Sequence, residues 1–236
     1  MAEDIAPVLL KDVERRFRQN LSRKGVNLKK DIQRARDGTL TNVHAFSNKV
    51  GDALADAFGS ITAESLPEGT MFYNIADRVM RPPLTEAYTM VSDVADEVQT
   101  VANRKAGIGL KAIRPPIEED RVKGLIDAVT SAEFKDTEHY LDYPVKCLVD
   151  HFADNHMAKN AEFLDESGVY TYVIRTAEAN CCDWCADRAG TYEGYREAQE
   201  NEAFARHDGC RCTVEILCGK TRGSMTATSG HAFVRS

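Results

Sequence analysis

The spacing of the cysteines restricts what this chain can fold into more than any other feature of its sequence. Five of the seven cysteines fall in one short stretch near the C-terminal end. Cys182 and Cys185 are separated by two residues, and His207, Cys210 and Cys212 follow within six positions. Zn²⁺ favours four sulfur or nitrogen ligands in a tetrahedron. We therefore predict a metal site, called the clasp below, which forms when these two groups meet.

More donors are present than one zinc ion can bind, so they are ranked by their spacing. The candidate ligands are Cys182 and Cys185, then Cys210 and Cys212, with His207 as an alternative to either. Cys181 ranks last, because adjacent side chains in an extended chain point apart. Four protein ligands leave no open coordination position, so the expected zinc is structural and contributes directly to the free energy of folding.

Two other interpretations of the cysteine cluster stay open. Disulfides could form once lysis exposes the chain to oxygen, or the thiols could simply pack around Trp184. The odd number of cysteines, in a chain without a signal-peptide pattern at its start, favours a metal site over a disulfide framework. Cys147 and Cys218 stand alone in apolar surroundings and are expected to be core thiols.

Two histidines lie outside the clasp, in a stretch that we expect to be helical. A spacing of five residues turns His151 and His156 about 140° apart on a helix, so they cannot share one ion. We expect both at the surface or at a helix end.

The pattern of apolar residues predicts helices in the first part of the chain and strands only near its end. Helices are expected over 5–24, 26–38, 41–59, 72–81 and 84–105, with the fourth ending before the Pro82-Pro83 pair. Two glycines and a second proline pair predict an extended connector over 106–116. After it we expect helices over 118–130 and 145–163 and strands over 169–175 and 213–217.

These elements predict a mainly α fold with a small α+β C-terminal module stapled by the Cys/His metal site. The expected domains are a helical N-terminal region over 1–105, an α+β domain over 106–218, and a flexible tail over 219–236. The tail is rich in Gly, Ser and Thr, a composition that is loosely held unless a partner orders it. No stretch approaches the roughly 20 apolar residues that cross a bilayer, so no membrane partner is expected.

Charge is unevenly distributed along the chain, whose formal net charge is -7. Residues 1–37 hold ten Lys and Arg against six Asp and Glu, a net charge of +4 that leaves −11 for the remainder. A basic region of this kind is a candidate contact for DNA or an acidic protein, and its alternative is a solvated helix face. The candidate partner-binding residues are Arg15, Arg16, Arg18, Arg23, Lys24, Lys29 and Lys30.

Several short motifs around the clasp resemble the C-terminal motif of phage Mu F-like minor head proteins, especially the version found in phages and prophages of Gram-positive bacteria. The resemblance covers roughly residues 84–218. The motifs are Val173-Ile-Arg-Thr, Cys181-Cys-Asp-Trp-Cys185, Ala189-Gly-Thr-Tyr192 and Arg206-His-Asp-Gly-Cys-Arg-Cys-Thr-Val214, with Asn103 to Lys111 and Pro115 to Arg121 upstream. Family members often have Asn-Cys-Asp-Cys where this chain has Gly209-Cys-Arg-Cys, so Arg211 departs in charge.

The resemblance implies a minor structural protein of a tailed-phage head, present in few copies and made in the cytoplasm of a host bacterium. In the virion it would lie in the capsid interior or at the portal vertex and act in head assembly and in DNA packaging or delivery. Its expected partners are the portal protein, the major capsid protein or both, which the helical N-terminal region would contact. Packaged DNA is a further expected partner, through the basic N-terminal residues.

Two other classes of function are weighed against a structural role. A zinc-stabilised nucleic-acid-binding module would fit the basic start of the chain, but the clasp is flanked by acidic residues such as Asp183 and Asp208. An enzyme could use Arg175 on a strand with Glu193 and Glu197. A strand arginine paired with surface acids explains those three residues more simply, and we expect no enzymatic activity.

Overall fold

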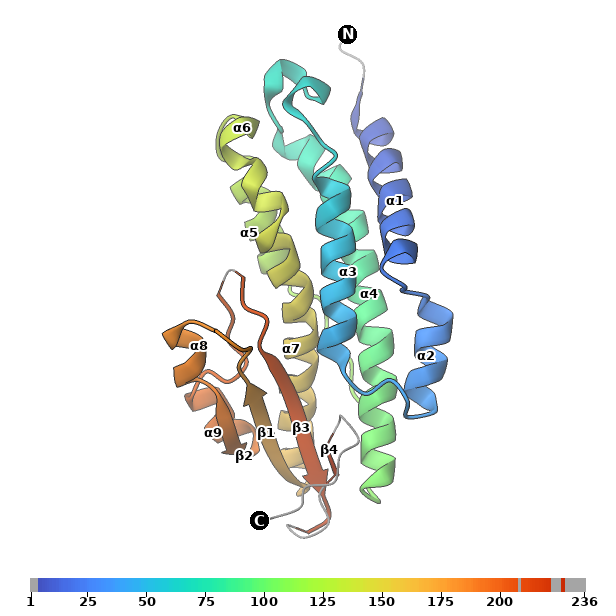
Figure 1. The fold of residues 1–236 in the computed structure, drawn as a ribbon, viewed down its shortest axis with the longest axis vertical. Helices are drawn as coiled ribbons and strands as arrows, with labels where there is room; N and C mark the ends of the chain where they lie inside the picture. Colours follow the sequence, from blue (N-terminus) through green and yellow to red (C-terminus); the bar gives the residue numbers. More distant parts are fainter. Residues whose placement is uncertain (1–3, 208, 222–225, 228–236) are drawn as a thin grey trace.

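The computed structural model describes residues 4–207, 209–221 and 226–227. The chain is mainly helical, with a small antiparallel sheet near its C-terminal end and the Cys/His cluster beside that sheet (Figure 1). This arrangement confirms the predicted fold class. The flexible tail predicted over 219–236 falls largely outside the described residues. None of the described helices is long and apolar enough to cross a membrane.

Four long helices lie side by side along the long axis of the molecule and form most of its body (Figure 1). They are α1 (Ala6–Arg23), α3 (Val43–Phe58), α4 (Tyr73–Lys105) and α7 (Tyr143–Glu166). Between them come the shorter elements α2 (Leu28–Arg36), η1 (Ala63–Ser65), η2 (Pro67–Gly69), α5 (Glu119–Val129), α6 (Phe134–Thr137) and η3 (Glu138–Leu141). Helices α7 and α4 both contact the sheet.

Apolar spacing explains where the first helices form and which face each one buries. In α1, Val13, Phe17 and Leu21 recur every four residues and all three are buried, as expected for one face of a helix. Helices α2 and α3 begin at asparagine N-caps. The side chain of Asn27 accepts a hydrogen bond from the backbone of residue 30, and Asn42 accepts one from residue 45.

The proline pair does not end a helix, and the prediction of two helices over 72–81 and 84–105 is wrong. Helix α4 continues from Tyr73 to Lys105 through Pro82 and Pro83. Each proline removes one backbone hydrogen bond, but one face of the surrounding turn is deeply buried, with Met80 and Leu84 fully inaccessible to solvent and Pro83 buried beside them. Tertiary packing therefore outweighs the local cost of the prolines.

The connector between α4 and α5 is extended, as predicted, and it runs along α7. Asn160 on α7 holds its backbone at both polar atoms of Ile113, accepting from the backbone N–H at 2.9 Å and donating to the carbonyl oxygen at 2.8 Å. Arg114 forms ion pairs with Asp93 and Asp96 on α4. The connector thus covers one face of α7.

The prediction that His151 and His156 lie at the surface or at a helix end is wrong. Both lie in the middle of α7, and His156 is fully buried, with Nε2 2.8 Å from a carboxylate oxygen of Asp96. His151 is half-buried and pairs with Glu118. The helical spacing could not show which acids pack against each ring, and these contacts decide their burial.

The sheet has the order β2-β1-β3-β4, with all neighbours antiparallel. Its strands are β1 (Tyr170–Thr176), β2 (Gly190–Glu193), β3 (Thr213–Gly219) and the two-residue β4 (Thr226–Ala227). Strands β1 and β3 agree with the two predicted strands to within two residues at each end. Between them the sequence analysis missed β2 and two short helices, α8 (Asp183–Asp187) and α9 (Gly194–Glu200).

Val173, Val214 and Ile216 of the sheet belong to the same apolar core as the helices. The core runs from Ala6 to Cys218, so the sheet is packed directly on the helical body. Cys218 is fully buried, which confirms it as a core thiol. Cys147 is only half-buried, so its assignment to the core is wrong. It lies near the start of α7, where its sulfur faces the backbone oxygen of His207 at 3.4 Å.

Candidate metal centre

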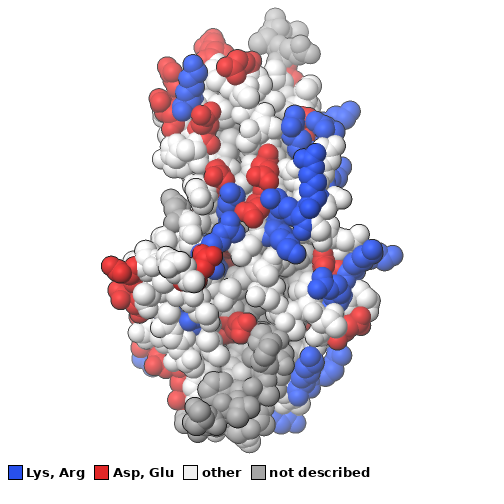
Figure 2. All heavy atoms as spheres, in the orientation of Figure 1, with Lys and Arg blue, Asp and Glu red and all other residues white. Residues whose placement is uncertain are grey.

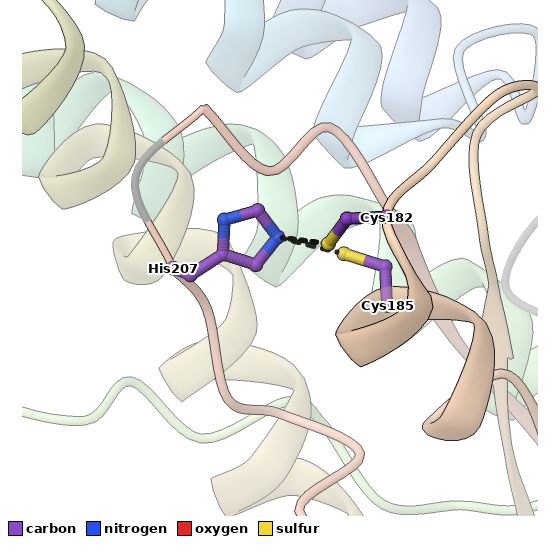
Figure 3. A group of neighbouring side chains, drawn as sticks. All are labelled: Cys182, Cys185 and His207. Atoms are coloured by element: carbon purple, nitrogen blue, oxygen red, sulfur yellow. Dashed lines mark hydrogen bonds between the residues drawn. The ribbon is translucent and has the colours of Figure 1, made fainter.

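The antiparallel pairing of β1 with β3 brings the two halves of the clasp together. Thr176 at the end of β1 faces Thr213 at the start of β3, so the segments that follow β1 and precede β3 leave the sheet at the same edge. Cys182 caps the N-terminus of α8 and Cys185 lies in its only full turn. His207 approaches the two cysteines from the loop before β3 (Figure 3).

The five predicted ligands form two groups of three that share Cys185. In the first, the His207 Nε2 atom lies 3.2 Å from the sulfur of Cys182 and 3.0 Å from that of Cys185. In the second, the sulfurs of Cys185 and Cys210 are 3.7 Å apart, with Cys212 completing the group. Two sulfurs that share a tetrahedral zinc ion at about 2.3 Å would be ~3.8 Å apart. The spacing of the donors therefore suits a metal of this size.

The clasp is dry on one side and open on the other. Cys185, Cys210 and Cys212 are 2–3% exposed, whereas Cys182 is exposed and His207 half-buried. Cys181 packs against the apolar side of the cluster and belongs to neither group of donors, which agrees with its last place among the candidate ligands. All seven cysteines are free thiols.

Tight turns bring the donors together on each side. On the α8 side, the backbone N–H of Cys185 donates to the carbonyl of Cys182 at 3.0 Å. On the β3 side, the N–H of Cys210 donates to the carbonyl of His207 at 3.1 Å, and Gly209 adopts a φ of 79°. Glycine takes this left-handed conformation without strain, so Gly209 permits the turn that brings His207 and Cys210 together.

The thiols of the clasp differ in their tendency to ionise. Burial raises the pKa of Cys185, and the neighbouring sulfurs of Cys212 and Cys210 raise it further. Burial also raises the pKa of Cys210. For Cys212 burial acts in the same direction, but hydrogen bonds from the Glu178 backbone and the adjacent thiols, with the charge of Arg175, lower its pKa overall. Buried thiols crowded in this way bind soft or borderline divalent cations when deprotonated.

Arg175 points into the clasp and does not pair with surface acids as expected. It lies on the buried face of β1 with Thr171 and Val173 and is 2% exposed. Its Nη1 donates to the carbonyls of Ala203 at 2.9 Å and Ala205 at 2.6 Å, and its Nη2 lies 3.6 Å from the sulfur of Cys210. The pairing with Glu193 and Glu197 is wrong because strand alternation turns the arginine inward.

A buried ionic cluster beneath the clasp was missed by the sequence analysis. Arg206 forms a two-pronged ion pair with Asp154 on α7 and contacts His44 on α3 at 3.1 Å. The same guanidinium donates to the carbonyls of Cys210 at 3.1 Å and Cys212 at 2.9 Å. Arg206 therefore joins the ligand loop to both α3 and α7.

Burial decides the protonation of the groups around Arg206. It lowers the pKa of His44 to about 4 and raises that of Asp150 to about 6. Burial would also raise the pKa of Asp154, but the charges of Arg206 and His44 hold it below its ordinary value. The one signal in the sequence was the pair Asp150 and Asp154, two acids four residues apart on a helix that is otherwise apolar on that face.

Arg211, the residue that departs from the family pattern, has a partner on α3. Its guanidinium donates to Asn48 at 2.7 Å and to Asp52 at 2.9 Å. The positive charge at this position is thus matched by an acid that lies far away in the sequence, and the neighbouring thiols keep their places in the clasp.

The predicted basic region lies on the side of the molecule formed by α1 and α2 (Figure 2). Four of its seven candidate residues, Arg15, Arg16, Arg18 and Lys24, form ion pairs with acids of the same chain. Within the described ranges, Arg23, Lys29 and Lys30 are exposed and have no acid at ion-pair distance. Acidic side chains lie among the basic ones on this face (Figure 2).

Comparisons of the chain with protein-family models, with curated proteins and with solved structures found no match.

Proposed function

We propose that the clasp is a structural zinc site. The chemistry and spacing of its donors support this proposal, since four cysteine sulfurs and one imidazole nitrogen form two groups of three that share Cys185, and the donor atoms of each group lie within 4.8 Å of one another. Four protein ligands would close the coordination shell and leave no place for a substrate or an activated water. The ion would then tie the start of α8 to the loop before β3.

We further propose that the chain is a minor structural protein of a tailed-phage head, acting in head assembly and in DNA packaging or delivery. The observation that carries this proposal is that the motifs resembling the Mu F-like family fold into one unit. They supply the second half of β1, most of α8 and β2 and the start of β3, together with every donor of the clasp. In this proposal the helical body contacts the portal or the inner capsid, and the clasp keeps the C-terminal module folded.

The zinc site is tested by native mass spectrometry of the full chain before and after treatment with a chelator. A mass loss equal to one zinc ion is expected from the wild type and not from Cys185→Ser, because Cys185 belongs to both groups of donors. Cys218→Ser is the matched control, because Cys218 is a buried cysteine of the core outside both groups. A wild-type chain that carries no metal when purified or after zinc is added would refute the site.

The head function is tested by asking whether the protein remains in purified phage heads after their DNA has been removed. We expect the protein to stay bound to these heads. If the portal is its partner, it should be missing from heads assembled without the portal protein. Release on nuclease treatment would instead favour the nucleic-acid-binding alternative. The triple variant Arg23→Gln, Lys29→Gln, Lys30→Gln separates the two, because only DNA binding should weaken when these unpaired cations are removed.

A further inference from the structure

Arg175 is buried beside the clasp without a carboxylate partner among the described residues. Its hydrogen bonds go to two backbone carbonyls, in the loop that carries His207, and its Nε has no hydrogen-bond partner within the described part of the chain. The ring of Trp184 lies 5.6 Å from the guanidinium carbon. A buried guanidinium that lacks a counter-charge is strongly destabilising.

The other arginines near the clasp are already neutralised. Arg206 forms its ion pair with Asp154, and Arg188, which stacks on Trp184 at 3.9 Å, pairs with Glu202. Arg175 differs from both because, among the described residues, the groups beside it that can carry a negative charge are thiols of the clasp, and the sulfur of Cys210 lies 3.6 Å from its Nη2.

A metal–thiolate centre supplies the missing counter-charge. A divalent ion with three thiolates and one neutral imidazole carries a net charge of −1, and four thiolates would give −2. Either centre is an anion placed in an apolar pocket, where burial is costly unless a cation lies against it. Arg175 is in position to be that cation in any centre that includes Cys210.

We propose that Arg175 is the internal counter-ion of the clasp and acts through Cys210, which it holds as a coordinating thiolate. The inference rests on the proposed zinc site. Arg175 is therefore a positioning residue, because its side chain contacts a metal ligand and not the ion itself. It also explains why this arginine lies on the buried face of a strand, where an apolar residue would be cheaper.

The first test compares zinc affinities of full-length variants by competition with a chromophoric chelator. Arg175→Gln, which can still donate one hydrogen bond but is neutral, should bind zinc about 10–100-fold more weakly than the wild type. Arg175→Lys should retain most of the affinity because it retains the charge. Arg188→Gln is the matched control, since Arg188 stacks on the same Trp184, and its affinity should stay near that of the wild type. Equal losses in Arg175→Gln and Arg188→Gln, or in Arg175→Gln and Arg175→Lys, would overturn the proposal.

The second test asks whether Arg175 acts through Cys210. Arg175→Gln is introduced into the Cys210→Ser and Cys212→Ser backgrounds, and the change in affinity is measured in each. We expect the further loss to be small when Cys210 is already replaced and clearly larger when Cys212 is replaced. In the cobalt-loaded proteins, the sulfur-to-metal charge-transfer absorption should fall in Arg175→Gln as it does in Cys210→Ser. Additive losses in both backgrounds, or an unchanged spectrum, would contradict the inference.

The wild type separates this inference from the zinc site on which it rests. A wild-type chain that binds neither zinc nor cobalt refutes the site itself. A wild type that binds both, with an Arg175→Gln variant that binds equally tightly, refutes only the role of Arg175. If circular dichroism shows that Arg175→Gln does not fold, Arg175→Lys replaces it in the double-variant comparison. A loss of affinity in Arg175→Lys must then vanish in the Cys210→Ser background, and a loss that persists there overturns the proposal.

Discussion

At the scale of single residues, Arg206 decides how firmly the clasp is attached to the helices. Its guanidinium is almost fully buried and contacts Asp154 and His44 on one side and two backbone carbonyls of the ligand loop on the other. Replacing a whole buried ion pair with apolar residues can cost little, but removing one partner leaves the other charge buried and uncompensated. The two-sided contacts of Arg206 make this position sensitive.

We predict that Arg206→Met lowers the free energy of unfolding by about 3–5 kcal/mol, because Asp154 is left buried with only His44 beside it. Urea denaturation measures the change. Arg196→Met is the control, since the Arg196 side chain is 91% exposed, and it should change stability by less than about 0.5 kcal/mol. Adding Asp154→Asn to Arg206→Met should recover part of the loss. A loss in Arg206→Met no larger than that in the control would show that the buried pair is not needed.

Asp150 is predicted to make stability depend on pH in the unusual direction for a carboxylate. Its pKa is raised from 3.8 to about 6, chiefly by burial, so the folded chain binds a proton more tightly than the unfolded chain between these values. Stability from this group therefore falls as pH rises from about 4 to 6. Across that pH window the ionisation of Asp150 should lower the free energy of unfolding of the wild type by about 3 kcal/mol, and Asp150→Asn should not show this decrease.

The measurement is the difference in unfolding free energy between Asp150→Asn and the wild type, at several pH values from 4 to 7. The variant should gain on the wild type as pH rises. His44, whose pKa burial lowers to about 4, contributes stability that is lost as pH falls from about 6.5 toward 4. This opposing contribution is present in both proteins and largely cancels in the difference. A difference that stays constant with pH would rule out the buried carboxylic acid.

The donors of the clasp could be predicted from the sequence, whereas most of the residues around them could not. Two thiols separated by two residues, and a second group within six positions, form a local pattern that can be recognised without knowing the fold. The partners of Arg206 cannot be recognised in this way, because His44 is 162 residues away from it in the chain and Asp154 is 52. Only the packing of α3 and α7 brings them together.

At the scale of elements, periodicity predicted the long helices and the two central strands but failed where packing outweighs local preference. Pro82 and Pro83 should end a helix by their backbone chemistry, and α4 passes through them because one face of the surrounding turn is packed in the core. The short elements between β1 and β3 were missed for a different reason. Helix α8 has five residues, too few to show an apolar period.

The extended connector is predicted to depend on Asn160, which binds both backbone atoms of Ile113 from its buried position on α7. Asn160→Ala should lower the free energy of unfolding by about 1–3 kcal/mol, because it removes two part-buried hydrogen bonds that hold the connector. Hydrogen exchange should show faster exchange at the Ile113 amide. Asn155→Ala on the same helix is the control, since its side chain has no hydrogen bond within the described ranges, and it should affect neither measurement.

At the scale of the whole molecule, the clasp and the helical body are mechanically connected. The ligand loop is held by Arg206 against α3 and α7, Arg211 adds contacts to α3, and the sheet shares one apolar core with the helices. If the proposed zinc binds, it should therefore stabilise the ligand loop and its contacts with α3 and α7 as well as the five donors. Loss of the ion should loosen the loop first and weaken its attachment to α3 and α7.

We predict that the stability of the whole chain rises with zinc concentration, by about 2.7 kcal/mol when free zinc is 100 times the dissociation constant, because the ion binds the folded chain and not the unfolded one. Thermal unfolding with and without a chelator measures this shift, and hydrogen exchange after chelation should increase over residues 203–207 and in the facing turns of α3 and α7. Cys185→Ser should abolish the dependence on zinc, whereas Cys218→Ser should preserve it even if its overall stability is lower. Equal zinc dependence in these two variants would place the ion elsewhere.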